Sequence, residues 1–259
     1  MADAVSEAMP ARVVPAASGV RWLLEGWNIF RAAPLAWMAL VFAYLFAITL
    51  SWQIPYAGAA LAVLFTPAIS VSFMAVARAG QRRAAIGPEL VAEGFRRGLR
   101  PQLVLGLVYG ACVGAIYAAA NLLLGEVPAA NAQDPEASLG GMVWLLALYA
   151  PVMMMFWFAP VLAAWHGATP GKALFFSFAG FLINWRAFAA YGAASVAAVL
   201  GLTALLVLGA RLLSPQLAPA TLALPMFVAV FPTLCGSYYA SYRDVFGYIA
   251  ASSNDEKTS

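Results

Sequence analysis

The feature that most constrains this chain is a series of apolar runs, each close to the length that crosses a lipid bilayer. A transmembrane helix needs about 20 consecutive apolar residues. Only 10% of the 259 residues are charged, whereas a soluble domain carries about 25%, so too little polar surface is available to cover a water-soluble globule. We therefore expect a membrane protein. The six runs of roughly that length cover residues 34–51, 55–77, 103–124, 142–165, 187–208 and 222–242.

The expected fold is all-α and polytopic, with about six transmembrane helices arranged as three helical hairpins. Short amphipathic segments precede the hairpins, and the first of them covers residues 19–31. There Trp22, Trp27 and Phe30 cluster with Leu23 on one side, so this segment is expected to lie in the headgroup region. We expect a disordered tail over residues 1–18, a single transmembrane domain over 19–249 and a second disordered tail over 250–259.

The distribution of Lys and Arg predicts the orientation. Of the 14 Lys and Arg residues, only Arg211 falls in the loops on one side of the six runs, which leaves 13 on the other side. Cytoplasmic loops carry the excess of positive charge, so both termini are expected in the cytoplasm of a bacterium, with the chain in its inner membrane. The first apolar run follows a polar segment, and we expect no cleavable signal peptide.

An internal repeat appears when the runs are paired. A Gly-aromatic pair followed by an arginine precedes each odd-numbered run, and a proline after a phenylalanine lies inside each even-numbered run. Coincidence is the alternative, because Gly, Phe and Pro are common here. The pairs are Gly26-Trp27, Gly94-Phe95 and Gly180-Phe181, and the prolines are Pro67, Pro160 and Pro232.

Several stretches are similar to one family of membrane proteins. They are Gly26 to Trp37, Pro55 to Gly58, Phe73 to Arg78 and residues 157–185. In these the chain resembles the BPSS-type family, whose members are multi-pass bacterial inner-membrane proteins of unknown function. The resemblance implies an all-helical fold in the cytoplasmic membrane and no particular activity.

Few residues offer chemistry. His166 is the only histidine, and neither it nor the two cysteines, Cys112 and Cys235, have the neighbours that a metal site would need. General acid–base catalysis needs a carboxylate or nucleophile nearby, and no acidic residue lies in a predicted span. His166 is therefore interpreted as an interfacial residue that caps a helix, with a functional role as the alternative. We expect no enzymatic activity, cofactor or metal.

The prolines within the even-numbered runs, Pro67, Pro160 and Pro232, are candidate helix-break positions. Broken helices often line a binding cavity near the middle of the membrane. Alternatively, the prolines produce kinks that improve packing, with the freed backbone groups satisfied by neighbouring helices.

Residues 88–100 combine apolar side chains with arginines in a predicted amphipathic helix that starts at Pro88. Arginines near an anionic leaflet each contribute about 1 kcal/mol to membrane binding, although the rule that determines topology also explains the cluster. We therefore predict membrane lipids, including anionic ones, as partners, besides other membrane proteins, and no nucleic acid. The candidate lipid or interface residues are Arg96, Arg97, Arg100, His166, Lys172 and Arg186.

Two functions remain open. The first is a non-enzymatic membrane protein that organises lipid or supports a membrane complex. The second is a transporter or channel for a neutral or lipid-like solute, which would need a cavity with converging polar groups between the even-numbered spans.

Overall fold

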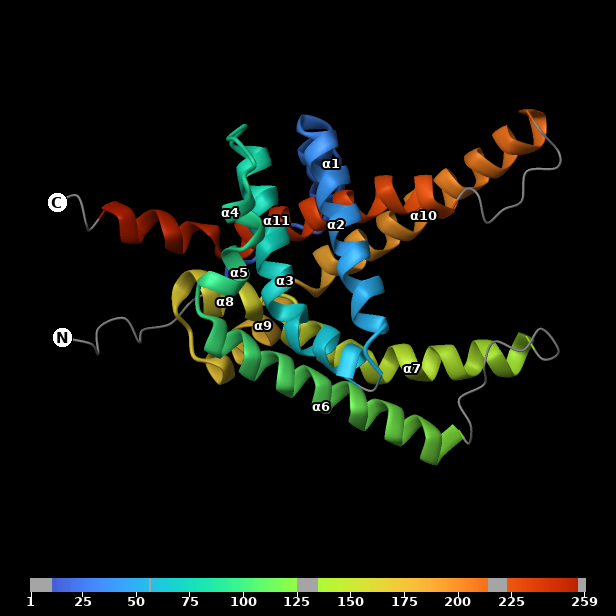
Figure 1. The fold of residues 1–259 in the computed structure, drawn as a ribbon, viewed down its shortest axis with the longest axis horizontal. Coiled ribbons are helices and arrows are strands. Elements are labelled where there is room, and N and C mark those ends of the chain that lie inside the picture. Colours follow the sequence, from blue (N-terminus) through green and yellow to red (C-terminus); the bar gives the residue numbers. More distant parts are fainter. Residues whose placement is uncertain (1–10, 56, 125–134, 214–222, 256–259) are drawn as a thin grey trace. The chain divides into compact units, whose positions relative to one another are not determined.

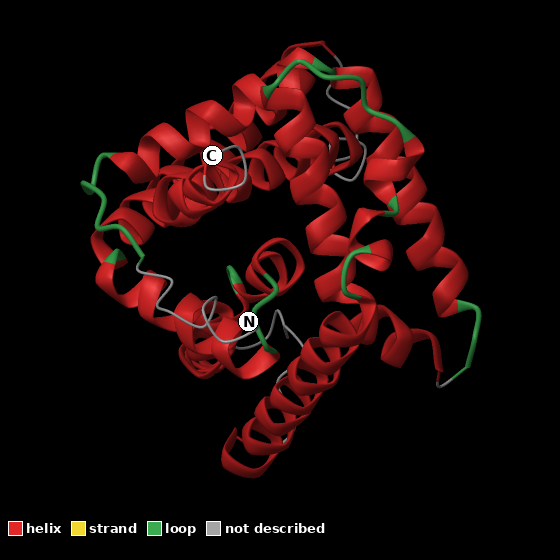
Figure 2. Ribbon diagram, turned by 90° about the vertical axis from the view of Figure 1, so that its left-hand side faces the viewer, coloured by secondary structure: helices red, strands yellow, loops and turns green. Residues whose placement is uncertain are grey.

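A computed structural model describes residues 11–55, 57–124, 135–213 and 223–255. The side chains are described over residues 11–55, 57–122, 143–212 and 226–247. All regular secondary structure in the described ranges is helical (Figure 2). The predicted all-α class is therefore confirmed.

The order of the helices repeats along the described chain. One or two shorter helices are followed by two long stretches of helix, and this pattern occurs three times, with the second long stretch of the second group divided into two helices (Figure 1). The first group is α1 (Ser18–Ala32), α2 (Pro34–Trp52) and α3 (Ala57–Gln81). The second is α4 (Pro88–Val91), α5 (Glu93–Arg96), α6 (Leu99–Leu124), α7 (Pro135–Phe156) and α8 (Ala159–His166). The third is α9 (Pro170–Ile183), α10 (Trp185–Leu213) and α11 (Ala223–Asp255).

Five stretches of helix in the described part of the chain are long and apolar enough to cross a membrane. The sixth predicted span falls within α11, but the described part of α11 is less apolar than the others because hydroxyl side chains such as Ser237, Tyr239 and Ser241 occur in it. The sixth span therefore stays a prediction. The five are Pro34–Trp52, Ala57–Gln81, Leu99–Leu122, Val143–His166 and Trp185–Leu212.

The chain divides into two compact units. The first comprises Met1–Leu50, Ser72–Glu93 and Leu182–Ser259, and the second comprises Ser51–Val71 and Gly94–Phe181. Each is described separately below.

In the first unit, α1 packs along α10 and α11. Its buried residues, Ser18, Gly19, Trp22, Gly26 and Ile29, follow the helical repeat on one face. Sequence analysis placed this segment in the headgroup region with Trp22 and Trp27 on a common apolar side. In the structure the Trp22 side chain is fully buried, whereas Trp27 is 42% exposed. The small residues on the buried face are the reason, because they let α1 approach its neighbours closely.

An aromatic cluster joins α2, α3 and α11 within the first unit. Phe73 contacts Trp37, Tyr44 and Phe231, with ring centroids 6.5, 5.5 and 5.2 Å away. Such pairs add about 0.5–1.5 kcal/mol beyond the burial of their surface. The cluster therefore fixes the position of α2 and of the last turns of α3 against α11.

In the second unit, the predicted fourth span is interrupted between α7 and α8, at Trp157 and Phe158. In a continuous helix the Phe158 amide would donate to the Met154 carbonyl. Instead the Ser177 hydroxyl of α9 lies between them: it accepts from the Phe158 amide at 2.8 Å and donates to the Met154 carbonyl at 2.9 Å. A side chain inserted into the helical hydrogen-bond ladder is a recognised cause of a helix break.

The three candidate break positions behave differently. Pro160 lies in the first turn of α8, directly after the interruption. Pro67 and Pro232 lie inside α3 and α11, which continue through them, so neither of these two helices ends at its proline. A proline removes one backbone donor, and a helix tolerates this loss where packing holds it together. Only at Pro160 does a second disturbance, the inserted Ser177 hydroxyl, add to the missing donor.

Candidate functional site

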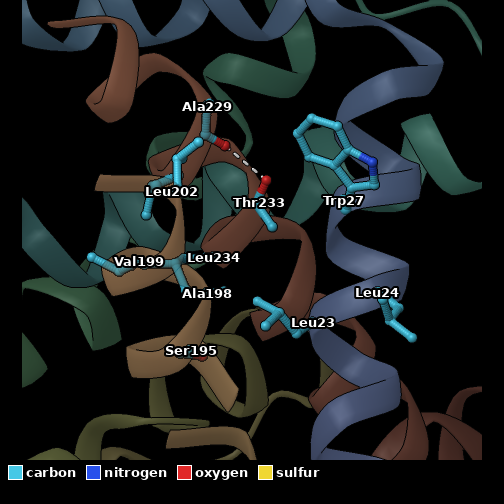
Figure 3. A pocket seen from close by; sticks show the side chains of 11 residues that line it. Leu23, Leu24, Trp27, Ser195, Ala198, Val199, Leu202, Ala229, Thr233 and Leu234 are labelled. Atoms are coloured by element: carbon cyan, nitrogen blue, oxygen red, sulfur yellow. Dashed lines mark hydrogen bonds between the residues drawn. The ribbon is translucent and has the colours of Figure 1, made fainter. Parts of the chain in front are cut away.

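A groove of about 230 Å³ lies between α1, α10 and α11 in the first unit. Figure 3 shows Leu23, Leu24 and Trp27 projecting from α1 on one side, and Ser195, Ala198, Val199 and Leu202 lying along α10 on the other. The remaining wall is formed by Ala229, Val230, Thr233 and Leu234 of α11.

The lining of the groove is almost wholly apolar. Besides the Trp27 indole, Ser195 and Thr233 supply its only polar side chains, and no lining residue is ionisable. The Thr233 hydroxyl donates to the Ala229 carbonyl at 2.7 Å, drawn as a dashed line in Figure 3, so it is already satisfied within its own helix. Leu24 is 60% exposed, which leaves the rim open on that side. The groove can hold an apolar chain but offers nothing that would bind a charged group.

Close backbone packing holds α1 in place as a wall of the groove. A methyl group added to Gly236 of α11 would lie only 2.8 Å from backbone atoms of Gly26 in α1. A methyl group added to Gly19 would likewise meet the backbone of Ala187 and Tyr191 in α10. Small residues at helix crossings allow this approach.

A polar cluster connects α1 to Arg243 and Asp244 of α11. Asp244 accepts hydrogen bonds from the Trp22 indole at 2.9 Å and from Arg21 at 2.8 Å. Arg243 pairs with Glu25 and with Asp244, each at 2.8 Å. The cluster contains two cations and two anions, so its formal charges cancel. It fixes α1 rather than attracting an ion.

The electrostatics of Asp244 reflect this arrangement. Partial burial raises the pKa of Asp244, but the hydrogen bonds from Arg243, Trp22 and Arg21 outweigh it and leave that pKa below its ordinary value of 3.8. The charged form is therefore the one that the docked α1 stabilises.

The segment before α1 is also held against the first unit. The Asn184 side chain donates to the Arg12 carbonyl at 2.9 Å and accepts from the Val14 amide at 2.8 Å. The Arg12 amide donates to the Val245 carbonyl at 3.0 Å. From the sequence alone we expected residues 11–17 to belong to a disordered tail. The structure differs because Asn184 can pair with both backbone groups of an extended segment.

The predicted lipid-contacting segment is not one continuous helix. It forms α4 and α5, two helices of four residues each that are separated at Ala92. Glu93 is buried and pairs with Arg78 at 3.0 Å, which draws the start of α5 inward. Gly98 then takes a positive φ of 73° before α6 begins, a conformation that glycine adopts readily. The candidate residues in this segment, Arg96, Arg97 and Arg100, are all exposed.

The other candidate residues are His166, Lys172 and Arg186. His166 is the last residue of α8, but Gly167, with a φ of 66°, is the residue that terminates the helix. Lys172 is exposed in the first turn of α9, and the Arg186 guanidinium lies 5.5 Å from the centre of the Trp185 ring. None of the predicted lipid or interface residues lines the groove. The lining of the groove could not be predicted from the sequence. Most of it consists of ordinary Leu, Val and Ala residues, and they come from three helices that are distant in the chain.

Comparison with known proteins gives one informative match. The chain is 37% identical, over 250 residues, to a probable inner membrane protein of Burkholderia thailandensis. The alignment covers 90% of this chain and 93% of that protein. No family model and no solved structure matches the chain.

Proposed function

Because the chain belongs to the family of multi-pass bacterial inner membrane proteins represented by its Burkholderia thailandensis relative, we propose that it is a non-enzymatic lipid-binding protein. In this proposal the groove between α1, α10 and α11 holds an acyl chain of a membrane phospholipid.

The lining of the groove is the observation that carries the proposal. Its walls are apolar on three helices, and its polar side-chain groups are the Trp27 indole and two hydroxyls, of which that of Thr233 is bonded to its own helix. Pockets for drug-sized ligands typically enclose about 300–1,000 Å³ and hold several placed polar groups. A groove of about 230 Å³ without ionisable groups fits a segment of hydrocarbon chain better than a polar solute.

Orientation belongs to the same proposal. We place both termini in the cytoplasm, because 13 of the 14 Lys and Arg residues, all but Arg211, fall on one side of the predicted spans. Single cysteines introduced at Leu90 and at Asn131, in a protein variant that carries no other cysteine, test this by labelling in intact cells. Asn131 lies outside the described residues. Labelling from outside at position 131 alone is expected, and labelling at position 90 alone would reverse the orientation.

A groove-filling substitution tests the proposed lipid site. Ala198 and Ala197 are adjacent exposed residues of α10, and only Ala198 lines the groove. Ala198→Phe should occupy the groove and lower the number of phospholipid molecules that stay bound through purification in mild detergent. Native mass spectrometry measures that number, and Ala197→Phe is the matched control. Equal lipid retention in the two variants would refute the proposed site.

A further inference from the structure

A second cavity lies between α6 and α7 in the second unit. Its volume is about 380 Å³, within the range that is typical of ligand pockets, roughly 300–1,000 Å³. Four aliphatic and three tyrosine side chains line this cleft, which we call the tyrosine cleft: Val113, Ile116, Leu145, Leu146, Tyr109, Tyr117 and Tyr149.

Two of the tyrosines form a hydrogen-bonded pair with a donor to spare. The hydroxyl oxygens of Tyr109 and Tyr149 lie 2.6 Å apart. One hydroxyl donates to the other, so the second keeps its own proton for another acceptor. No such acceptor is found for either hydroxyl among the residues whose side chains are described. A donor without a partner in apolar surroundings costs about 1–3 kcal/mol, and a ligand with a suitable acceptor would remove this cost.

The pair lies well inside helices that can span the membrane. Tyr109 is 10 residues after Leu99, where α6 begins, and Tyr149 is 14 residues after Pro135, where α7 begins. At 1.5 Å per residue these positions are about 15 Å and about 21 Å along their helices. The headgroup and ester region of a phospholipid lies outside the hydrocarbon core, so a molecule dissolved in that core brings an acceptor to this depth more readily than a phospholipid headgroup does.

We propose that the tyrosine cleft binds a neutral, membrane-dissolved molecule of the quinone class, whose ring carbonyl accepts the spare tyrosine proton. The cleft has no charged lining residue, which favours a neutral ligand. Its three tyrosine side chains supply aromatic surface against which a flat ring can pack, and Tyr117 is 62% exposed. The aliphatic residues accommodate the alkyl tail. This inference does not depend on the proposed acyl-chain groove, which other helices form.

Binding of decylubiquinone to the full chain in nanodiscs tests the inference. The readout is the saturable quenching of tryptophan fluorescence, with decylbenzene as a competitor that has a ring and tail but no carbonyl. The double variant Tyr109→Phe/Tyr149→Phe removes both hydroxyls and should weaken binding about fivefold to tenfold. Each single variant keeps one donor and should bind nearly as well as the wild type. Tyr117→Phe, which alters a lining residue outside the pair, is the control.

A second pair of variants keeps the test decisive if the double variant does not fold. Val113→Phe fills the cleft and leaves both hydroxyls in place, whereas Ala115→Phe adds the same ring at an exposed position that does not line the cleft. Only Val113→Phe should abolish saturable quenching. The inference is overturned if wild-type protein shows no saturable quenching, if decylbenzene displaces decylubiquinone when the two are present at equal concentrations, or if Val113→Phe binds like Ala115→Phe.

Discussion

Gly236 of α11 faces Gly26 of α1 so closely that a methyl group on Gly236 would lie 2.8 Å from the Gly26 Cα and carbonyl oxygen. This crossing holds α1 as one wall of the apolar groove. It also explains why this segment, whose aromatic residues predicted a place in the headgroup region, is docked against other helices in the structure. Its buried face consists largely of small residues, which bring the helix backbones together.

Gly236→Ala should therefore destabilise the protein. Alanine favours a helix by about 1 kcal/mol over glycine, but overpacking at a tight contact costs about 1–3 kcal/mol, and here the obstructing atoms are backbone. The expected result is a lower melting temperature in detergent. Gly201→Ala in α10, where nothing lies within 4 Å of the added carbon, is the control and should melt at the same or a higher temperature.

The polar cluster at Asp244 predicts a dependence on pH. The pKa of Asp244 is lower in the folded protein than its ordinary value of 3.8. The contribution of Asp244 to the free energy of unfolding is therefore present above about pH 4 and is lost as the pH falls through the lowered value. Asp244→Asn keeps an acceptor for Trp22 but removes the ion pairs. Melting curves between about pH 3 and pH 6 should show a steeper acid loss for wild type than for this variant. Parallel curves would contradict the role given to Asp244.

The inserted Ser177 hydroxyl predicts a non-additive pair of substitutions. Ser177→Ala leaves the Phe158 amide and the Met154 carbonyl without their bonds, which should cost about 1–3 kcal/mol. Pro160→Ala alone restores a backbone donor and should leave a folded protein. In the double variant the two helices can join into one, so the cost of removing the hydroxyl should shrink. A double-mutant cycle of unfolding free energies measures this coupling, and purely additive costs would argue against it.

Much of this fold follows from the sequence, because apolar length and composition determine where a helix can cross a membrane. The run over 34–51 became α2, Pro34–Trp52, and the run over 187–208 lies inside α10, Trp185–Leu213. Contacts between distant segments could not be predicted from the sequence. Asn184 binds backbone groups 170 and 172 residues away, and no local pattern records such a pairing. Likewise, the docking face of α1 contains Ser and Gly, which do not register as an apolar stripe.

A separate prediction concerns the exposed arginines near the start of the Gly94–Phe181 segment of the second unit. Phe95 and Leu99, 39% and 38% exposed, flank Arg96 and Arg97, and we expect them to provide apolar contact with the inner leaflet. Because this contact brings the charges within a Debye length of the headgroups, replacing Arg96, Arg97 and Arg100 with Gln should reduce the anionic lipid that co-purifies. Melting in detergent should stay unchanged. An unaltered lipid composition would leave these arginines as determinants of topology alone.

Photo-crosslinking with a phospholipid that carries a diazirine midway along one acyl chain tests the proposed lipid site most directly. Mass spectrometry of the crosslinked peptides locates the adducts. Adducts should concentrate on groove residues such as Leu24 and Ala198, and Ala198→Phe should remove those on α1, whereas Ala197→Phe should not. Adducts spread evenly over exposed apolar residues such as Leu35, Leu122 and Leu212, as expected for lipid that merely surrounds the protein, would contradict the proposal.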